Sequence, residues 1–306
     1  MCSPGPRFPH FRVLSSPHTI LTAGLFVRLL LLGASGMFGS DAAAVFREAG
    51  YEVLGADLPE VDITRPSSLA DFLDAHPCDL VLNAAAYTNV DGAEDHREEA
   101  FRINAFGAEV VARACRDRNL ALAHISTDYV FPGAREAGYV PSDPPGPPVN
   151  AYGASKLAGE EAIRAVLPED RLLICRTQWL YGRHGKNFVD TIRGLAASRA
   201  SLSVVNDQWG VPTHTAELAR QIARLLTLGA RGVAHTVGGG GPITWFTFAR
   251  EIVALAGLPC EVLPCSSEAF PRPAKRPRHA WLRSGVPADA GPWKDSLLSY
   301  LRESGS

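Results

Sequence analysis

Near the start of the sequence, an apolar run leads through three spaced glycines into a segment of helical character. The run Leu29 to Leu32 is followed by Gly33, Gly36 and Gly39, and residues 41–48 have the composition of a helix. Glycines at such positions permit a tight turn and a close approach of the backbone to pyrophosphate, and the helix N-terminus offers free N–H groups to the phosphates. The order of strand, glycine turn and helix predicts a dinucleotide site, and an ordinary glycine-rich turn is the weaker alternative.

An acidic residue follows the next predicted strand. Residues 51–56 have strand character, and Asp57 comes directly after them, about 20 residues beyond the glycines. A carboxylate at this place can accept hydrogen bonds from the 2′-hydroxyl of an adenosine ribose, which mildly favours NAD over NADP. No arginine follows Asp57 immediately to hold a 2′-phosphate, and Arg65 is only a distant candidate.

Apolar strands and helices alternate from residue 27 to residue 176. After the second strand we expect a helix at 67–75, a strand at 79–83, a long helix at 98–118, a strand at 120–126, a helix containing Tyr152 and a strand at 171–176. Buried apolar strands that alternate with helices indicate a parallel sheet covered on both faces. We therefore predict an α/β fold: a doubly wound, Rossmann-like NAD(P)-binding domain over residues 27–176, followed by a smaller mixed α/β substrate-binding lobe over residues 177–306.

The first 26 residues differ from the rest of the chain. They contain four prolines and no clear periodicity, and they precede a first strand that needs nothing before it. Cleavage of a signal peptide within residues 19–32 would destroy the glycine turn, which argues against a secretory leader. We expect residues 1–26 to form a disordered extension, with a native product that begins near Val27.

Composition excludes several classes of partner. The net charge of −2, from 30 basic and 32 acidic side chains, gives no footprint for nucleic acid or for an anionic membrane. No run of about 18 apolar residues is present, so we expect no membrane span. The six cysteines form no C-x-x-C pair, and the nine histidines form no H-x-x-x-H, which indicates free thiols in a reducing, cytoplasmic compartment and no independent metal site.

A tyrosine and a lysine stand four residues apart where a helix is predicted to begin. Tyr152 and Lys156 would share one face of that helix. A nearby ammonium ion favours phenolate, so we expect Lys156 to lower the pKa of Tyr152 from its usual value of about 10. The pair alone is weak evidence, since many solvated helix faces carry one. Beside a hydride source, it indicates the proton donor of a carbonyl reductase.

Polar or small residues follow three of the predicted strands. They are 83–86, 126–129 and 176–179. Ligands of parallel sheets bind beyond the carboxyl ends of the strands, so we expect these segments to converge with the glycine turn and with Tyr152 and Lys156 on one rim. Each segment alone could be a helix cap or a turn, and their convergence favours a site.

Five ordered motifs resemble the dTDP-4-dehydrorhamnose reductase family of extended short-chain dehydrogenases. They are NAAAYTNVDGAE at 83–94, ISTDYVF at 125–131, YGASKLAGE at 152–160, RTQWLYG at 176–182 and NDQWGVPT at 206–213. The resemblance runs from about Val27 to the C-terminus. It implies reduction of a 4-keto-6-deoxy-L-hexose carried on dTDP, with NADPH or NADH, to dTDP-L-rhamnose.

The resemblance also implies individual roles. Tyr152 would donate a proton to the ketone oxygen, Lys156 would hold the nicotinamide ribose, and Thr127 would hydrogen-bond the developing alkoxide. Substrate contacts would come from Thr127, Asp128 and Trp179, and Arg276 of the segment 272–277 would contact the diphosphate. For Trp179 a core position, and for Arg276 a solvated basic loop, are the alternatives. The dinucleotide would be lined by Gly33, Gly36, Met37, Phe38, Gly39, Asp57, Asp62, Ile63, Ala84, Ala85, Ala86, Tyr152 and Lys156.

Departures from the family pattern leave alternatives open. The loop before the Tyr152 helix has Pro141, Ser142 and Asp143 where many members have an acidic residue, and Ala280 replaces a serine. Some members bind a divalent metal in a dimer interface; a homodimer is therefore expected, although no metal ligands can be placed here. The other candidate functions are 4-ketoreduction of a different nucleotide deoxysugar, and a non-catalytic regulatory subunit like that of methionine adenosyltransferase.

Overall fold

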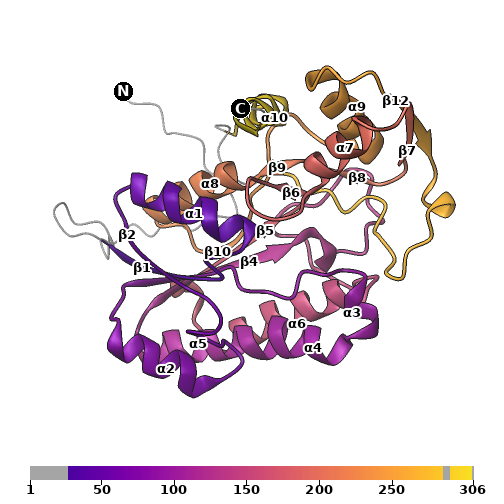
Figure 1. Ribbon diagram of the computed structural model, residues 1–306. Coiled ribbons are helices and arrows are strands. Elements are labelled where there is room, and N and C mark those ends of the chain that lie inside the picture. Colours follow the sequence, from indigo (N-terminus) through magenta and orange to yellow (C-terminus); the bar gives the residue numbers. More distant parts are fainter. Residues whose placement is uncertain (1–26, 285–289, 305–306) are drawn as a thin grey trace, which may run out of the picture.

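A six-stranded parallel sheet forms the centre of the molecule (Figure 1). The computed structural model describes residues 27–284 and 290–304, so the expectation for residues 1–26 lies outside the described residues. In spatial order the strands are β10 (Gly232–His235), β5 (Leu172–Thr177), β4 (Ala121–Thr127), β3 (Leu80–Asn83), β1 (Arg28–Leu32) and β2 (Glu52–Ala56). Every neighbouring pair is parallel. The predicted α/β class is confirmed.

Helices cover both faces of this sheet, because its strands are apolar on both sides. Leu29 and Leu31 of β1 belong to the cluster that includes α1 (Met37–Glu48) and α8 (Thr215–Thr227). Leu30 and Leu32 face the opposite cluster, with α2 (Pro66–Ala75), α5 (Ala108–Asp117) and α6 (Ala151–Val166). Figure 1 shows α1 and α8 above the sheet and the other three helices below it. Alternate leucines of a single strand therefore supply two separate cores.

The predicted long helix over residues 98–118 is interrupted. It consists of α4 (Arg97–Phe101), a π-helical segment (Arg102–Gly107) and α5, and it follows the short helix α3 (Gly92–Asp95). Asn104 lies in the π segment, where its amide exchanges hydrogen bonds of 2.8 and 3.0 Å with the backbone of Tyr87 and donates to Ser155 Oγ at 2.9 Å. The widened turn thus connects the loop after β3 to α6.

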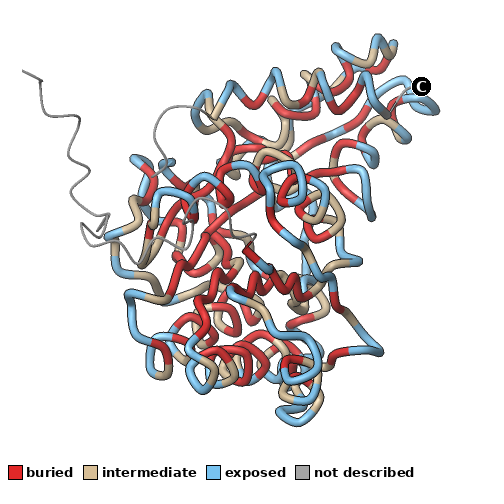
Figure 2. The backbone as a smooth tube through the Cα atoms, turned by 90° about the vertical axis from the view of Figure 1, so that its left-hand side faces the viewer, coloured by how far each residue is buried: buried red, intermediate tan, exposed pale blue. Residues whose placement is uncertain are grey.

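A smaller lobe lies beside the carboxyl ends of the sheet. Its elements are the helices α7 (Phe188–Ala196), α9 (Trp245–Leu255) and α10 (Trp293–Ser304), and the paired strands β6 (Leu180–Tyr181) with β9 (Thr213–His214), β7 (Ser201–Val205) with β12 (Glu261–Cys265), and β8 (Trp209–Gly210) with β11 (Ile243–Thr244). The helices pack around a third apolar cluster. Figure 2 shows buried residues running through the middle of both lobes.

The chain enters and leaves the smaller lobe more than once. The predicted boundary at residue 176 falls at the end of β5, but α8 and β10 lie later in the sequence and belong to the layers of the large sheet. Thr244 is the N-cap of the small-lobe helix α9, and its hydroxyl accepts from the Thr247 N–H at 3.2 Å. Among the described residues, no helix is long and apolar enough to cross a bilayer.

Candidate active site

A cavity of about 690 Å³ crosses the carboxyl ends of five neighbouring strands, from β2 to β5. Four interstrand steps of about 4.8 Å give it a length of roughly 19 Å. The predicted site residues that line it are Gly33, Gly36, Met37, Phe38, Gly39, Asp57, Asp62, Ile63, Ala84, Ala85, Ala86, Thr127, Asp128, Tyr152, Lys156 and Trp179. The chain turns from β1 to β2 on one side and continues to β3 on the other, so the cavity lies at the point where the strand order reverses.

The glycine turn brings backbone N–H groups to the cavity wall. Gly33 has φ +79°, and a Cβ there would lie 2.7 Å from the Ala85 nitrogen. A Cβ on Gly39 would overlap the carbonyl oxygen of Gly33, whereas one on Gly36 would meet nothing closer than 3.3 Å. Gly36 is the N-cap of α1 and supplies no side-chain cap, which leaves the first N–H groups of α1 free for an anion.

Acidic side chains occupy the β2 end of the cavity. Asp57 Oδ2 accepts from the Ser35 backbone N–H at 3.1 Å and from the Ser35 hydroxyl. This carboxylate is therefore hydrogen-bonded to the middle of the glycine turn. Asp62 Oδ1 accepts from the N–H and hydroxyl of Thr64 at 2.8 and 2.7 Å. Although burial opposes the change, these hydrogen bonds and nearby arginine charges hold the pKa of Asp62 below its ordinary value.

An arginine that sequence reasoning missed also lines this end. Arg102, at the start of the π segment, lines the cavity and donates to Thr64 Oγ1 at 2.7 Å. The sequence offers no local signal for this contact, since Arg102 comes 38 residues after Thr64. The Arg102 side chain thus supplies a cation at the end of the cavity where Asp57 was expected to contact the adenosine ribose.

Helix α6 carries the tyrosine and lysine to the other end of the cavity. Asn150 caps this helix, because its Oδ1 accepts from the Gly153 N–H at 2.8 Å. Lys156 is buried, and its Nζ donates to the Ile125 carbonyl oxygen at 2.7 Å. Burial lowers the pKa of Lys156 to about 8, although the charge of Glu160 opposes this effect.

The pKa of Tyr152 changes in the direction opposite to that expected. Part of the residue remains exposed, but its hydroxyl lies in the interior, and this burial raises the pKa to about 12, with a further increase from the Asp128 charge. A hydrogen bond with Thr127 acts in the lowering direction, while Lys156 is not among the causes. The expectation that Lys156 lowers the Tyr152 pKa is therefore wrong for this structure, because burial and the Asp128 charge raise this pKa and only the Thr127 hydrogen bond lowers it.

Thr127 connects Tyr152 to a buried carboxyl group. Its hydroxyl is hydrogen-bonded to Tyr152, accepts from the Tyr129 N–H at 3.2 Å and donates to Asp128 Oδ1 at 3.0 Å. Burial raises the pKa of Asp128 to about 7. Three hydroxyl or carboxyl groups that can exchange protons thus form one hydrogen-bonded chain at the cavity wall.

Two stacked indoles close the β5 end of the cavity. Trp179 lies on Trp245 with ring centroids 3.5 Å apart and an angle of 12° between the rings, and both line the cavity. Trp179 has φ +48°, an unusual backbone conformation for a residue with a side chain, and a Cβ on Gly210 would overlap its indole. Sequence reasoning missed Trp245, the first residue of α9, because it lies far along the chain in the other lobe.

Comparisons with known proteins agree with this geometry. The family described as RmlD substrate binding domain matches residues 27–303. A dTDP-4-keto-6-deoxy-D-glucose reductase from Streptomyces niveus is 40% identical over 276 residues, which cover 90% of this chain and 93% of that protein. A dTDP-4-dehydrorhamnose reductase from Mycobacterium tuberculosis is 39% identical, covering 91% and 94% respectively. The chain belongs to the dTDP-4-dehydrorhamnose reductase family.

A solved structure of the family shares the fold closely. The dTDP-4-dehydrorhamnose reductase of Bacillus anthracis, solved in complex with NADP, superimposes with a TM-score of 0.86 at 35% sequence identity, covering 91% of this chain and all of that one. The predicted resemblance to the reductase family is confirmed.

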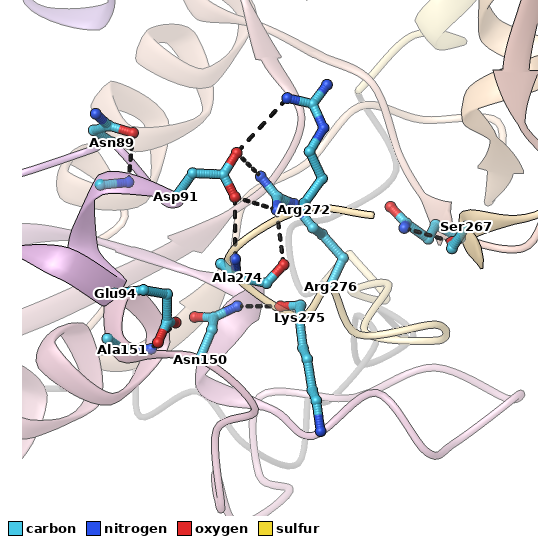
Figure 3. A network of polar contacts seen from close by, with 12 residues as sticks. Asn89, Asp91, Glu94, Asn150, Ala151, Ser267, Arg272, Ala274, Lys275 and Arg276 are labelled. Carbon is cyan, nitrogen blue, oxygen red and sulfur yellow. Dashed lines mark hydrogen bonds and ion pairs between the residues drawn. The ribbon is translucent and has the colours of Figure 1, made fainter. Parts of the chain in front are cut away.

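Arg276, the remaining predicted site residue, lies outside the cavity lining. Figure 3 shows its guanidinium facing the Asp91 carboxylate. Nη1 donates to Oδ1 at 2.5 Å, and Nη2 donates to Oδ2 at 2.9 Å. The neighbouring Lys275 carbonyl oxygen accepts from Asn150 Nδ2 at 2.7 Å, so this segment is attached to the cap of α6. The contact between Arg276 and the diphosphate stays a prediction. Because Nη1 and Nη2 are both bonded to Asp91, Arg276 would have to leave Asp91 to bind the diphosphate through both of these nitrogens.

Proposed function

We propose that this protein reduces the 4-keto group of dTDP-4-dehydro-L-rhamnose to give dTDP-L-rhamnose, with NADPH or NADH as reductant. The observation that carries the proposal is the hydrogen-bonded chain of Tyr152, Thr127 and Asp128 in the same cavity as the uncapped N-terminus of α1, which follows β1. A proton donor and an anion site within one groove, separated along the row of strand ends, suit a dinucleotide-dependent ketone reductase.

The residues present fit a dinucleotide. The free N–H groups of α1 suit its pyrophosphate, and the close approach of Gly33 to Ala85 leaves the cavity floor without protruding side chains. Bound there, the reduced nicotinamide supplies a hydride. The reductase of Bacillus anthracis that was solved with NADP supports this assignment.

The catalytic roles follow from the protonation states of the site. With its pKa near 12, Tyr152 keeps its proton at neutral pH and can donate it to the ketone oxygen. The Thr127 hydroxyl would stabilise the charge that develops on that oxygen. Lys156, one helical turn further along α6 in the cavity lining, would hold the hydroxyls of the nicotinamide ribose. The stacked Trp179 and Trp245 would exclude water and give the deoxysugar an apolar wall.

A second candidate differs only in the sugar. The relative from Streptomyces niveus is described as a dTDP-4-keto-6-deoxy-D-glucose reductase, and it matches this chain as well as the rhamnose-forming relatives do. Both reactions deliver hydride to C4 of a dTDP-bound ketone. The retained contact among Thr127, Asp128 and Tyr152 supports an enzyme over a regulatory subunit, which would have no use for a proton donor.

The test is loss of NADPH or NADH absorbance with the purified full-length protein and dTDP-4-dehydro-L-rhamnose, with dTDP-4-keto-6-deoxy-D-glucose in parallel. We expect faster turnover of the first sugar, and Tyr152→Phe should bind cofactor but lose most of the activity. Faster turnover of the second sugar would select the second candidate. Absence of turnover with both, alongside normal cofactor binding, would exclude both reductase functions.

We also infer that the protein is a cytoplasmic homodimer whose other partners are small molecules, with no nucleic acid or membrane among them. The free thiols of the five described cysteines support a reducing compartment, and the weak net charge supports the absence of a nucleic-acid partner. Analytical ultracentrifugation of the full chain measures the oligomeric state directly, and a single monomeric species at micromolar concentration would contradict the dimer.

A further inference from the structure

A row of buried polar side chains extends behind the cavity wall. It contains Asn83 at the end of β3, His124 beside it on β4 and Lys156 on α6. Asn83 and His124 do not line the cavity. His124 contacts Lys156, which does line the cavity, so the direction of each hydrogen bond in the row matters.

The orientation of the Asn83 amide is set by its neighbour along the chain. Its Oδ1 accepts from the Ala85 N–H at 3.1 Å, and its Nδ2 therefore faces His124 Nδ1 at 3.2 Å. An amide nitrogen only donates, so His124 Nδ1 must accept. Because a neutral imidazole carries a single N–H, the proton of His124 then lies on Nε2. Burial keeps His124 neutral by lowering its pKa well below the ordinary value, and any positive charge on Lys156 acts in the same direction.

The Nε2–H group of His124 is directed at the lysine. Nε2 lies 3.4 Å from Lys156 Nζ, which also donates to the Ile125 carbonyl oxygen at 2.7 Å. An ammonium group has three donors and no acceptor, so Nε2–H against ammonium is an unfavourable contact of two donors. A neutral amine can accept from Nε2 and still donate to Ile125.

We propose that Asn83 and His124 are positioning residues that act through Lys156: Asn83 fixes the Nε2–H tautomer of His124, and this N–H favours the neutral amine form of Lys156. The proposal deepens the proposed function, since it rests on Lys156 being the catalytic cation. It assigns a role to two residues that touch neither the substrate nor the dinucleotide.

The charged groups around Lys156 act in both directions. On α6, Glu160 favours the ammonium form, and Arg176 of β5 partly offsets this because it is paired with Glu160. Tyr152 stays neutral near pH 7. Burial opposes the ammonium and lowers the Lys156 pKa from 10.5 to about 8. The Nε2–H of His124 on β4, 3.4 Å from Nζ, would act in the same direction. The reductase would therefore contain a lysine that titrates close to neutral pH.

The first test measures the tautomer of His124 directly. Long-range proton–nitrogen correlation spectra of the ¹⁵N-histidine-labelled, full-length protein distinguish a protonated from an unprotonated ring nitrogen. His124→Leu assigns the signal. We expect Nε2–H at His124 and the opposite tautomer at the buried His235, whose Nδ1 faces the Tyr139 carbonyl oxygen at 3.1 Å. A protonated Nδ1 at His124, alone or in an imidazolium, would overturn the proposal.

The second test measures the pKa of Lys156. The chain has only four lysines, so a ¹³C-lysine-labelled sample gives a simple spectrum in which the Cε shift of Lys156 reports its titration. Loss of one hydrogen bond worth about 1 kcal/mol should raise the Lys156 pKa by about one unit in His124→Leu. The buried His214→Leu, in the other lobe, serves as control and should leave it unchanged. A Lys156 pKa that is unchanged or lower in folded His124→Leu would overturn the proposal.

Activity adds a separate readout. If the ammonium form of Lys156 is required, kcat/KM falls as pH rises through its pKa, and His124→Leu should move that fall upward by about one pH unit. Both spectroscopic tests need no substrate, so failure of the proposed reductase activity would leave them informative. If His124 has the Nε2–H tautomer and His124→Leu raises the Lys156 pKa, but no sugar is turned over, the reductase function would be rejected. The roles of Asn83 and His124 toward Lys156 would be retained.

Discussion

Glu160 and Arg176 form an ion pair with two hydrogen bonds that is fully shielded from solvent, one helical turn beyond Lys156. Arg176 Nε donates to Oε1 at 2.9 Å and Nη2 donates to Oε2 at 2.6 Å, while Ser126 Oγ donates to Oε1 at 2.6 Å. The pair joins α6 to β4 and β5. It thereby fixes the helix that carries Tyr152 and Lys156 against β4, which carries Thr127, and β5, which Trp179 follows.

Removal of one partner should strongly destabilise the fold. Arg176→Met leaves the Glu160 carboxylate buried with only the partial support of Ser126 and Arg164, so we expect the free energy of unfolding to fall by about 3–5 kcal/mol. Urea denaturation followed by circular dichroism measures it. Arg113→Met, which breaks the exposed pair with Glu109, should cost no more than about 1 kcal/mol. Equal losses in both variants would contradict the role of the buried pair.

Asp128 should make stability depend on pH. Its pKa rises from 3.8 to about 7 on folding, so the folded state binds a proton between these values that the unfolded state has released. The contribution of Asp128 is fully present below pH 3.8 and is lost as pH rises toward 7. We expect the free energy of unfolding of the wild type, relative to Asp128→Asn, to decrease from pH 5 to pH 7.5 in parallel urea titrations. A difference that stays constant over this range would show that Asp128 ionises normally.

Trp245 should affect binding of the sugar substrate through Trp179. An aromatic stack is worth about 0.5–1.5 kcal/mol, so Trp245→Leu should raise KM for the dTDP sugar by about 2- to 12-fold, with a smaller change in kcat. Steady-state kinetics at saturating cofactor separate the two constants. Trp209→Leu, an exposed tryptophan outside the cavity lining, is the control. A loss confined to kcat would mean that the stack serves the chemical step instead.

Arg102 should discriminate between the two cofactors. A 2′-phosphate on the adenosine ribose would gain from a cation at this end of the cavity, whereas a 2′-hydroxyl would gain little. A screened contact worth about 1 kcal/mol predicts that Arg102→Ala weakens NADPH binding about fivefold and leaves NADH binding nearly unchanged. Fluorescence titration of both cofactors measures this, with Arg113→Ala as control. Equal weakening of the two would place the 2′-position elsewhere.

Local sequence signals were enough to predict the frame of the site. The glycine turn, the apolar strands and the Tyr152–Lys156 pair are each recognised from residues that are close together in the sequence. In the structure, the glycine turn, Tyr152 and Lys156 all line the cavity at the carboxyl ends of the strands, as expected. Parallel strands must end on one rim, so residues following different strands could be assigned to one cavity before any contact was known.

Contacts between distant segments were not predictable from single positions. Trp245 meets Trp179, and Arg102 meets Thr64, only because the chain folds back from another lobe or another helix. The π segment at 102–107 looks like ordinary helix in the sequence, and it reflects the three hydrogen bonds of Asn104 with the β3 loop and with α6. The Tyr152 pKa depends on how deeply its hydroxyl is buried, which spacing does not reveal.

The repeated crossing between lobes limits how members of this family can exchange parts. The chain leaves the sheet after β5, returns for α8 and β10, and leaves again toward α9. A smaller lobe taken from a relative with another sugar preference would therefore have to be joined to the large sheet at three points: after β5, before α8 and after β10. A single recombination point after β5 would separate α8 from the apolar face that it covers beside α1. New sugar specificities should arise more readily by point changes around Trp179 and Trp245 than by transfer of a whole lobe.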